Sequence, residues 1–341
     1  MKILFSVNHP AHVHLFKNLI WQLQKKQHDI LIVARKKEVT LDLLNIYNIK
    51  YELISEENET AFLLPLEMVQ RSKGLWRIMK NFKPDMAISQ MDPSLAIPSW
   101  LLGVPYVCLA DSEPALTSLY GSLPFTNTVF TPECFRKNIG RKQIRYAGYK
   151  ELAYLHPEIF KPNPSVLKEI GLLENEPYIL LRFVSWNASH DIIQKGLVNK
   201  DEIVRKLLPY GRILISSEKK LPDELEQYRI NISPEKIHDL LFYARILVTD
   251  SQTMTTEAAI LGTPAIRCNS FVGKNDMGNF IELEKKYGLI INCSDEREAL
   301  ENSISILENC QTKNVWKEKR DKLLSEKINL TDYLIKYIEN K

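Results

Sequence analysis

The chain has 341 residues, of which 45% are hydrophobic and 26% are charged, a composition typical of a globular protein long enough for two domains. Its formal net charge of +3 is small for this length and gives no support to nucleic-acid binding. The five cysteines are odd in number and form no Cys-x-x-Cys pair. This predicts free thiols in a reducing cytoplasm and disfavours a zinc site.

The start of the chain and its longest apolar stretch bear on membrane targeting. Residues 1–7 lead directly into an expected strand, without the apolar segment and cleavage site of a signal peptide. The stretch 96–110 is too short to span a bilayer and is interrupted by Pro98, Gly103 and Pro105. We therefore expect a cytoplasmic protein, and peripheral contact with the inner face of a membrane stays open.

Strands and helices alternate along the first half of the chain. Apolar runs predict strands at 2–7, 29–34, 50–54, 86–89, 105–110, 127–132 and 143–149. Apolar residues at helical spacing predict helices at 13–26 and 38–47. This alternation predicts a doubly wound parallel sheet.

Segment 62–83 is both apolar and basic. One helical face carries Leu75, Ile78, Met79 and Phe82, and the cations are Arg71, Lys73, Arg77, Lys80 and Lys83. Two interpretations are open: a helix packed on the sheet with a solvated basic face, or a surface that contacts anionic lipid headgroups or a lipid-linked acceptor.

The composition changes at 155–164, where three prolines in LHPEIFKPNP indicate a linker. The alternation then resumes, with strands expected at 178–184, 211–216 and 287–292 and helices at 200–208, 234–244 and from Asp295 onward. We expect domains at 1–154 and 165–325, a linker at 155–164, and a C-terminal helix at 326–341 that returns to the first domain.

The segment Ile246–Arg267 predicts a buried strand, a polar turn, a helix and a second buried strand. Ser251 or Thr253 is expected to cap the helix at its start, and Gly262 at its end. A helix that begins where a parallel strand ends is a natural anion site. The candidate phosphate donors are the hydroxyls of Ser251, Thr253, Thr255 and Thr256, and Glu257 could bind a ribose. An ordinary capped helix is the alternative.

Two loops of the first half carry titratable side chains directly after expected strands. Asn8–His14 contains three histidines, of which His12 is the candidate general base. A metal site is an alternative there, and packing is the expected role of His9 and His14. Asp111 and Glu113 could orient a histidine, accept the proton of an acceptor hydroxyl or hold a sugar hydroxyl. Helix capping and a carboxylate metal site are their alternatives.

Two loops of the second half carry donor candidates. Arg182 stands near the end of a buried strand, where its guanidinium could bind a diphosphate or form an internal ion pair. His190 follows in the same run without an assigned role. In the run 269–279, Gly273 suits close approach to a sugar, while Asp276 and Asn279 are spaced to face one side of a helix start.

Together these residues resemble the GT-B superfamily of nucleotide-sugar enzymes. Two relatives are the lipid II N-acetylglucosaminyltransferase and the non-hydrolysing UDP-N-acetylglucosamine 2-epimerases, and the sequence also resembles an uncharacterised domain-of-unknown-function family of this type. Asp250, Ser251, Glu257, Ala258 and the run Leu261–Pro264 resemble the donor site of the epimerases. The resemblance implies that Ser251 meets a phosphate and that Glu257 holds the ribose. Gln252 and Thr253 stand where that family has two glycines.

The remaining matches divide between the two relatives. Asp276 and Asn279 resemble donor-sugar contacts of the transferases, and Ala11–Val13 resembles the Gly-His-Val of the lipid II enzyme. The glycine-rich loop that precedes that motif is replaced by Asn8–Pro10. The Arg-Pro-Glu opening and the His-Arg-x-x-Asn signature of the epimerases are absent, which counts against an epimerase.

The resemblance implies a GT-B fold: two Rossmann-like domains, a cleft between them and a C-terminal helix that crosses back to the first. It implies a metal-independent glycosyltransferase of cell-surface glycan or polysaccharide biosynthesis, with a UDP-sugar as donor, no cofactor, and a glycan or lipid-linked acceptor. Membrane contact would run through 62–83. The alternatives are a UDP-sugar 2-epimerase or hydrolase, and a nucleotide-sugar-binding protein without catalysis.

Overall fold

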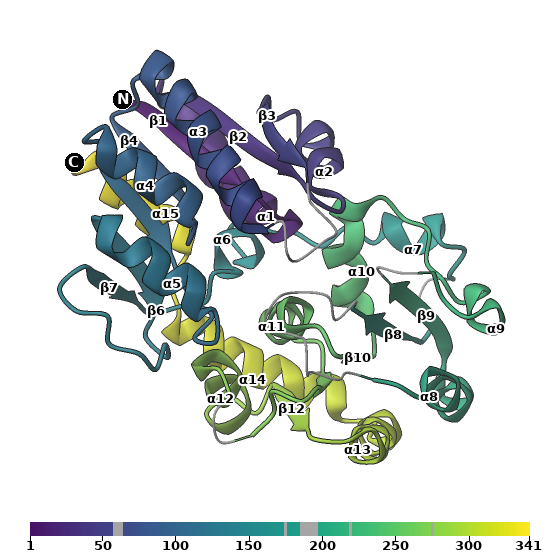
Figure 1. The fold of residues 1–341 in the computed structure, drawn as a ribbon. Helices are drawn as coiled ribbons and strands as arrows, with labels where there is room; N and C mark the ends of the chain where they lie inside the picture. Colours follow the sequence, from purple (N-terminus) through teal and green to yellow (C-terminus); the bar gives the residue numbers. More distant parts are fainter. Residues whose placement is uncertain (57–63, 174–175, 185–196, 218–219, 274–275) are drawn as a thin grey trace. The chain divides into compact units, whose positions relative to one another are not determined.

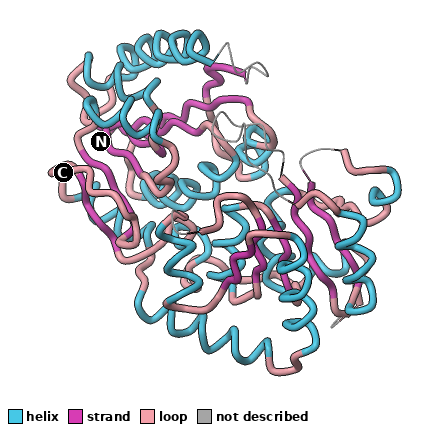
Figure 2. The backbone as a smooth tube through the Cα atoms, turned by 60° about the horizontal axis from the view of Figure 1, so that its bottom comes forward, coloured by secondary structure: helices cyan, strands magenta, loops and turns pink. Residues whose placement is uncertain are grey.

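The computed structural model describes residues 1–56, 64–173, 176–184, 197–217, 220–273 and 276–341. By its internal contacts the chain divides into two compact units, Met1–Tyr154 with Ile328–Lys341, and Leu155–Lys327. Each unit contains one parallel sheet with helices around it (Figures 1 and 2). The expected α/β class with two parallel sheets is therefore confirmed.

The first unit is built on a sheet with the order β3-β2-β1-β4-β5-β6-β7. Its strands are β1 (Lys2–Val7), β2 (Asp29–Lys36), β3 (Glu52–Glu56), β4 (Met86–Gln90), β5 (Tyr106–Leu109), β6 (Thr128–Pro132) and β7 (Gln143–Tyr146). Its helices are α1 (Pro10–Lys25), α2 (Thr40–Ile46), α3 (Leu64–Phe82), α4 (Pro93–Leu101), α5 (Leu116–Ser122), the 3-10 turn η2 (Leu123–Phe125) and α15 (Leu330–Glu339). The short helix α6 (Leu152–Leu155) lies at the boundary of the two units.

Two helical layers cover this first sheet. Helices α3, α4 and α5 pack side by side on one face, and α2, α1 and α15 cover the other (Figure 1). The α3–α4 side encloses a buried apolar cluster to which Leu75 and Met79 contribute from α3, and Leu95 and Ala96 from α4. Burial of such apolar side chains is the main force that holds helices to a sheet.

Helix α4 is an element that the sequence analysis did not predict. Asp92 caps its start by accepting from Ser94 N at 2.9 Å, and Pro93 occupies the first turn, where a missing N–H is tolerated. Pro98 lies inside the helix. The prolines that suggested a broken stretch are thus compatible with a short helix, since each removes a single donor.

Helix α15 completes the first unit. It packs against α1, Thr331 Oγ1 donates to the Ala153 carbonyl at 2.7 Å, and Tyr337 stacks edge-on against Phe130 of β6. The C-terminal residues therefore belong to the first unit, although they follow the second in sequence. No helix in the described part of the chain is both long and apolar enough to cross a membrane.

The second unit is built on a sheet with the order β12-β11-β10-β8-β9. Its strands are β8 (Tyr178–Phe183), β9 (Arg212–Ser217), β10 (Ile246–Thr249), β11 (Ala265–Cys268) and β12 (Ile290–Cys293). Its helices are α7 (Ser165–Glu169), α8 (Lys200–Leu207), α9 (Asp223–Glu226), α10 (Ile237–Tyr243), α11 (Gln252–Leu261), α12 (Gly278–Lys285), α13 (Glu296–Glu308) and α14 (Thr312–Glu326), with 3-10 turns η3 (Leu208–Tyr210) and η4 (Pro234–Lys236).

Candidate functional site

Each sheet has one point where its strand order reverses. In open parallel sheets, ligands bind beyond the carboxyl ends of the strands at such a point. In the first unit it lies between β1 and β4, which pair directly although β2 and β3 separate them in sequence. In the second unit it lies between β8 and β10. The loops that follow these four strands are the candidate sites.

Helix α11 begins at the reversal point of the second unit. Ser251 is its N-cap and accepts from Met254 N at 3.4 Å, and Gly262 ends it in the left-handed conformation with a φ of 82°. The strand, the cap and the terminating glycine predicted from the sequence are confirmed. The first N–H groups of the helix, at Gln252 and Thr253, have no partner within it and form the positive end of its dipole.

The hydroxyls predicted as phosphate donors fall into two groups. Ser251 and Thr253 lie at the start of α11. Thr255 is fully buried and donates its Oγ1 proton to the Ser251 carbonyl at 2.6 Å, while buried Thr256 accepts from Asn279 Nδ2 at 3.4 Å. The structure therefore uses Thr255 and Thr256 in helix packing, and Ser251 and Thr253 are the better placed for a ligand.

Asp250 ties the two strands of this reversal point together. Its Oδ1 accepts from Val184 N at 2.9 Å, directly after β8, and Thr249 Oγ1 donates to the Arg182 carbonyl at 3.0 Å. Arg182 itself points its Nη1 at Ser216 Oγ, 2.9 Å away on β9. The predicted arginine thus stands at the reversal point, half-buried. The rest of its loop, with His190, lies outside the described residues.

Glu257 is held by a histidine that sequence reasoning did not identify. The Glu257 carboxylate is buried, and its Oε1 lies 2.9 Å from Nε2 of His238 on α10, which is buried too. Phe160 packs edge-on against the same imidazole. No local spacing predicts such a contact, since the pair is 19 residues apart on different helices. The contact fixes the carboxylate, and its role on a ribose stays a prediction.

One of the candidates for the donor sugar, Asp276, binds a buried arginine. Arg267 on β11 is 0% exposed and binds both oxygens of Asp276, at 2.7 and 3.0 Å. Asn279 is buried beside Thr256, and its Oδ1 has no hydrogen-bond partner among the described residues. Gly273 has a φ of 144°, which favours glycine. Asp276 thus serves an internal ion pair, and contact with a sugar stays a prediction for all three.

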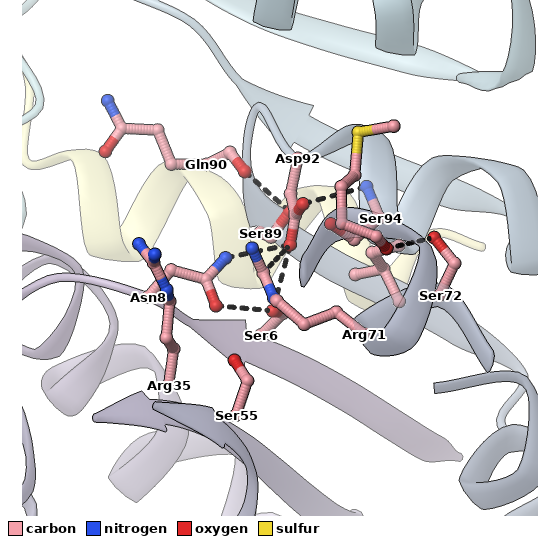
Figure 3. A network of polar contacts seen from close by, with 12 residues as sticks. Ser6, Asn8, Arg35, Ser55, Arg71, Ser72, Ser89, Gln90, Asp92 and Ser94 are labelled. Atoms are coloured by element: carbon pink, nitrogen blue, oxygen red, sulfur yellow. Dashed lines mark hydrogen bonds and ion pairs between the residues drawn. The ribbon is translucent and has the colours of Figure 1, made fainter. Parts of the chain in front are cut away.

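Asp92 is the centre of the reversal point in the first unit (Figure 3). It follows β4, is 4% exposed, and its Oδ2 accepts from Asn8 Nδ2 and Arg71 Nη2, both at 2.8 Å. Ser6 Oγ lies 3.3 Å from the same oxygen. The carboxylate therefore joins the end of β1, the end of β4 and helix α3.

A second ion pair lies one turn before Arg71 on α3. Buried Glu67 accepts from Nε and Nη2 of Arg35 at 2.6 and 2.8 Å, a bidentate contact to the end of β2. Sequence reasoning placed Arg71 on a basic face and did not consider Asp92. The available signal was the Asp-Pro pair after the strand at 86–89, which is typical of a helix start.

His12 lies in the first turn of α1, next to this network. Its Nδ1 accepts from Asn8 N at 3.3 Å, so in the neutral ring the proton is on Nε2 and that nitrogen is a donor. Burial and the positive charges of Lys150, Arg71 and Lys37 together lower the pKa of His12 to about 3, and burial is the largest of these causes. Because the Asn8 N–H occupies Nδ1, His12 is placed to donate a hydrogen bond from Nε2, and its role as general base stays a prediction.

The two carboxylates after β5 are also engaged. Asp111 forms a 2.6 Å ion pair with Lys150 and accepts from Gln90 Nε2 at 2.8 Å. Glu113 accepts from Arg136 N at 3.0 Å. Lys150 places a positive charge near both Asp111 and His12, and no local pattern in the sequence indicates this contact. Three metal-binding side chains do not gather anywhere within the described ranges.

The neutral state of His12 predicts how stability depends on pH. In the unfolded chain an ordinary histidine takes up its proton near pH 6.5, whereas His12 stays neutral in the folded chain down to about pH 3. Between these values the unfolded state binds more protons, so the free energy of unfolding falls as the pH is lowered. We expect this loss, measured by urea denaturation at neutral and acidic pH, to be smaller in His12→Gln. An equal loss in both proteins would contradict a neutral His12.

Solved structures with the same architecture include one that holds a nucleotide sugar by its own description. UDP-GlcNAc 2-epimerase from Neisseria meningitidis, solved bound to UDP-GlcNAc, has a TM-score of 0.69 and 13% identity over all of both chains. MurG from Acinetobacter baumannii has a TM-score of 0.59 and 14% identity, again over all of both chains. At these identities the likeness shows the fold alone, and the fold is GT-B.

The sequence comparisons identify relatives without a described activity. A protein of Methanocaldococcus jannaschii described as uncharacterized is 23% identical over 282 residues, which are 79% of this chain and 82% of that protein. A family model described as "Protein of unknown function (DUF354)" matches residues 1–331. Since the match extends over nearly the whole chain, the protein belongs to this family of unknown function.

Proposed function

We propose that the protein is a glycosyltransferase that takes its sugar from a nucleoside diphosphate, with UDP as the nucleotide. The observation that carries the proposal is the start of α11 at the β8/β10 reversal point, with Ser251 as its cap and Arg182 on the neighbouring strand. A helix N-terminus at this place is suited to a phosphate because its N–H groups and dipole favour negative charge. The GT-B fold, shared with the epimerase that holds UDP-GlcNAc, supports the same ligand class.

In this proposal the second unit binds the donor and stabilises the leaving diphosphate. Charge that develops on the diphosphate as the glycosidic bond breaks would be met by the α11 N–H groups, the hydroxyls of Ser251 and Thr253, and the Arg182 guanidinium. These groups belong to the protein itself, so the proposed step needs no bound metal or cofactor. Glu257, fixed by His238, is assigned to the ribose.

The first unit is assigned the acceptor, a glycan or a lipid-linked sugar. Its hydroxyl must lose a proton as it attacks, and Asp111 and Glu113 are the proposed bases because both are carboxylates at the carboxyl end of β5. His12, with Nε2 protonated, would donate a hydrogen bond to the substrate. Asp111→Asn or Glu113→Gln should then lower kcat more than His12→Gln, which keeps a donor group.

A pair of variants at Ser251 tests the donor site. Asp and Asn are both good N-caps, so Ser251→Asp and Ser251→Asn should both fold with melting temperatures close to that of the wild type. Only the aspartate places a negative charge where the phosphate is proposed to sit. We expect S251D to bind UDP at least about tenfold more weakly than S251N, because like charges repel strongly at close range.

Titration calorimetry with UDP and with uridine measures both affinities. The uncharged nucleoside is the control, since its affinity should be similar in the two variants. Equal UDP affinities in S251D and S251N would remove the support for a phosphate at α11. Incubation with UDP-sugars alone distinguishes the other chemistries: an epimerase would produce the epimer and a hydrolase free sugar, whereas a transferase needs an acceptor for full turnover.

A further inference from the structure

Helix α3 carries a second apolar stripe on the side that faces away from the core. Leu75 and Met79 are buried in the first unit, whereas Leu66, Val69 and Trp76 are exposed by 55%, 46% and 38%. Residues three, four and seven positions apart lie along one side of a helix, so these three form a continuous row. A solvated helix face normally carries polar side chains in such positions.

Positive charge accompanies this apolar row. Lys73 and Lys80 continue it, and Arg77 and Lys83 are exposed beside it. The acidic residues between positions 64 and 125 are almost all turned inward: Glu67, Asp92, Asp111 and Glu113 are buried and bonded within the unit. The one exposed carboxylate, Asp85, accepts from Lys2 N at 2.7 Å. The exposed charged side chains described on α3 are therefore all positive, while the neighbouring strand β3 carries exposed Glu52 and Glu56.

The neighbouring helices extend the same surface. Helix α4, which packs against α3 on the same face of the sheet, ends in Trp100 and Leu101, each 60% exposed (Figure 1). Trp100 contacts Phe125 of η2, with ring centroids 5.5 Å apart, and Tyr120 of the adjacent α5 is 60% exposed. Half of the exposed large hydrophobic side chains in the described chain lie on α3, α4 and α5.

A hollow with cationic and apolar walls lies at the end of this helical layer. It has a volume of about 400 Å³ and is lined by Tyr120, Leu123, Pro124, Ile139, Arg141 and Lys142. Lys142 Nζ donates to the carbonyls of Leu123 and Pro124 at 2.9 and 3.0 Å. These two hydrogen bonds hold the ammonium group against the residues that line the hollow. The hollow repeats the chemistry of the α3 surface, namely aromatic and aliphatic carbon next to fixed positive charge.

We propose that the outer surface of α3, α4 and α5 binds an anionic lipid bilayer. Lysine and arginine attract acidic headgroups, and tryptophan side chains prefer the depth at which headgroups meet acyl chains. A soluble polyanion would use the cations but gains nothing from exposed Leu66, Val69, Trp76, Trp100 and Leu101. The combination of the two side-chain classes on one helical layer favours the bilayer.

Vesicle sedimentation tests the proposal with the full-length protein and needs no substrate. The vesicles are phosphatidylcholine alone, or the same lipid with about 30 mol % phosphatidylglycerol, at low and raised salt. We expect binding to the anionic vesicles only, and weaker binding at the higher salt.

Two variants test the positive charges and the apolar side chains of this surface separately, and each has a matched control in the second unit. K73Q/K80Q/K83Q removes charge and is compared with K285Q/K313Q/K322Q, three exposed lysines of α12 and α14. W76A/W100A removes apolar contact and is compared with L173A/V198A, two residues that are 76% and 66% exposed. We expect each surface variant to lower the association constant at least about tenfold, and each control to stay within about twofold.

The outcomes separate the possible occupants. Absence of binding to anionic vesicles, or binding that both surface variants leave unchanged, would overturn the proposal. Loss of binding in the lysine variant together with full binding in the tryptophan variant would overturn it as well, because that pattern identifies a surface for soluble polyanions. Melting temperatures and UDP affinity are measured for every variant, so that unfolding and failure of the donor site are recognised separately.

Discussion

Arg267→Met is expected to lower the free energy of unfolding of the second unit by roughly 3–5 kcal/mol, the usual effect of removing one partner from a buried ion pair. Arg267 is fully buried on β11 and holds Asp276 by two hydrogen bonds. Its Nη1 also donates to Asn292 Oδ1 at 2.8 Å, and its guanidinium carbon lies 3.7 Å from the Phe280 ring centroid. The substitution would leave the Asp276 carboxylate in a buried position without this cation.

Urea denaturation followed by circular dichroism measures the effect, and Arg297→Met is the control. Arg297 pairs with Glu301 on the surface of α13, where its side chain is 89% exposed. Surface pairs of this kind contribute about 0–1 kcal/mol, so the control should unfold close to the wild type. A loss in R267M no larger than that in R297M would show that the buried pair does not stabilise the unit.

Asp92→Asn is expected to destabilise the first unit by about 2–3 kcal/mol and to abolish turnover while nucleotide binding is retained. The amide keeps the size of the carboxylate and can still accept from Ser94 N. It cannot neutralise Arg71, which is buried against Asp92 Oδ2. The Asn8 side chain would lose its charged acceptor too, and the loop that carries His12 would be less well fixed.

Asp85→Asn is the matched control, since Asp85 and Asp92 flank the same strand at opposite ends. Asp85 is exposed, so its loss should be small. Melting curves, UDP titration and turnover are compared for both variants. A D92N protein with wild-type turnover would exclude the first reversal point from catalysis, and one that fails to bind UDP would show that the effect is not confined to the first unit.

Much of the fold could be predicted from the sequence, because the signals are local. Apolar runs predicted the strands. The β10–α11 segment was predicted with a cap at Ser251 or Thr253, of which the structure uses Ser251, and with its terminating glycine at Gly262. Boundaries were less accurate: the strand expected at 143–149 ends at Tyr146. Helix α4 was not predicted since Pro98 argues against a helix, and the cap at Asp92 that starts it anyway was not recognised.

The pairings within the candidate sites could not be predicted, because they join distant segments. Arg71 and Asp92 are 21 residues apart, and Arg35 and Glu67 are 32 apart. Each pair forms only once the sheet order brings separate strands together. The same holds for Thr255 and Thr256, since a sequence does not tell whether a hydroxyl turns toward a ligand or back to its own helix.

His12 shows how an environment changes the role that a residue type suggests. An isolated histidine has a pKa near neutrality, which made it a candidate base. Burial and the three neighbouring cations lower that pKa to about 3, and the Asn8 N–H occupies Nδ1. The pKa shift cannot be derived from the run Asn8–His14 alone, because the cations come from α3 and from the segments around Lys37 and Lys150.

Calorimetric titration of the full-length protein with UDP, UMP and uridine tests the central proposal most directly. The start of α11 is assigned to a diphosphate, so affinity should fall stepwise from UDP to UMP to uridine as phosphate groups are removed. Binding of UDP should also raise the melting temperature with increasing ligand concentration. Equal affinity for all three compounds, or no binding of UDP, would contradict the assignment of the second unit as a nucleotide-sugar donor site.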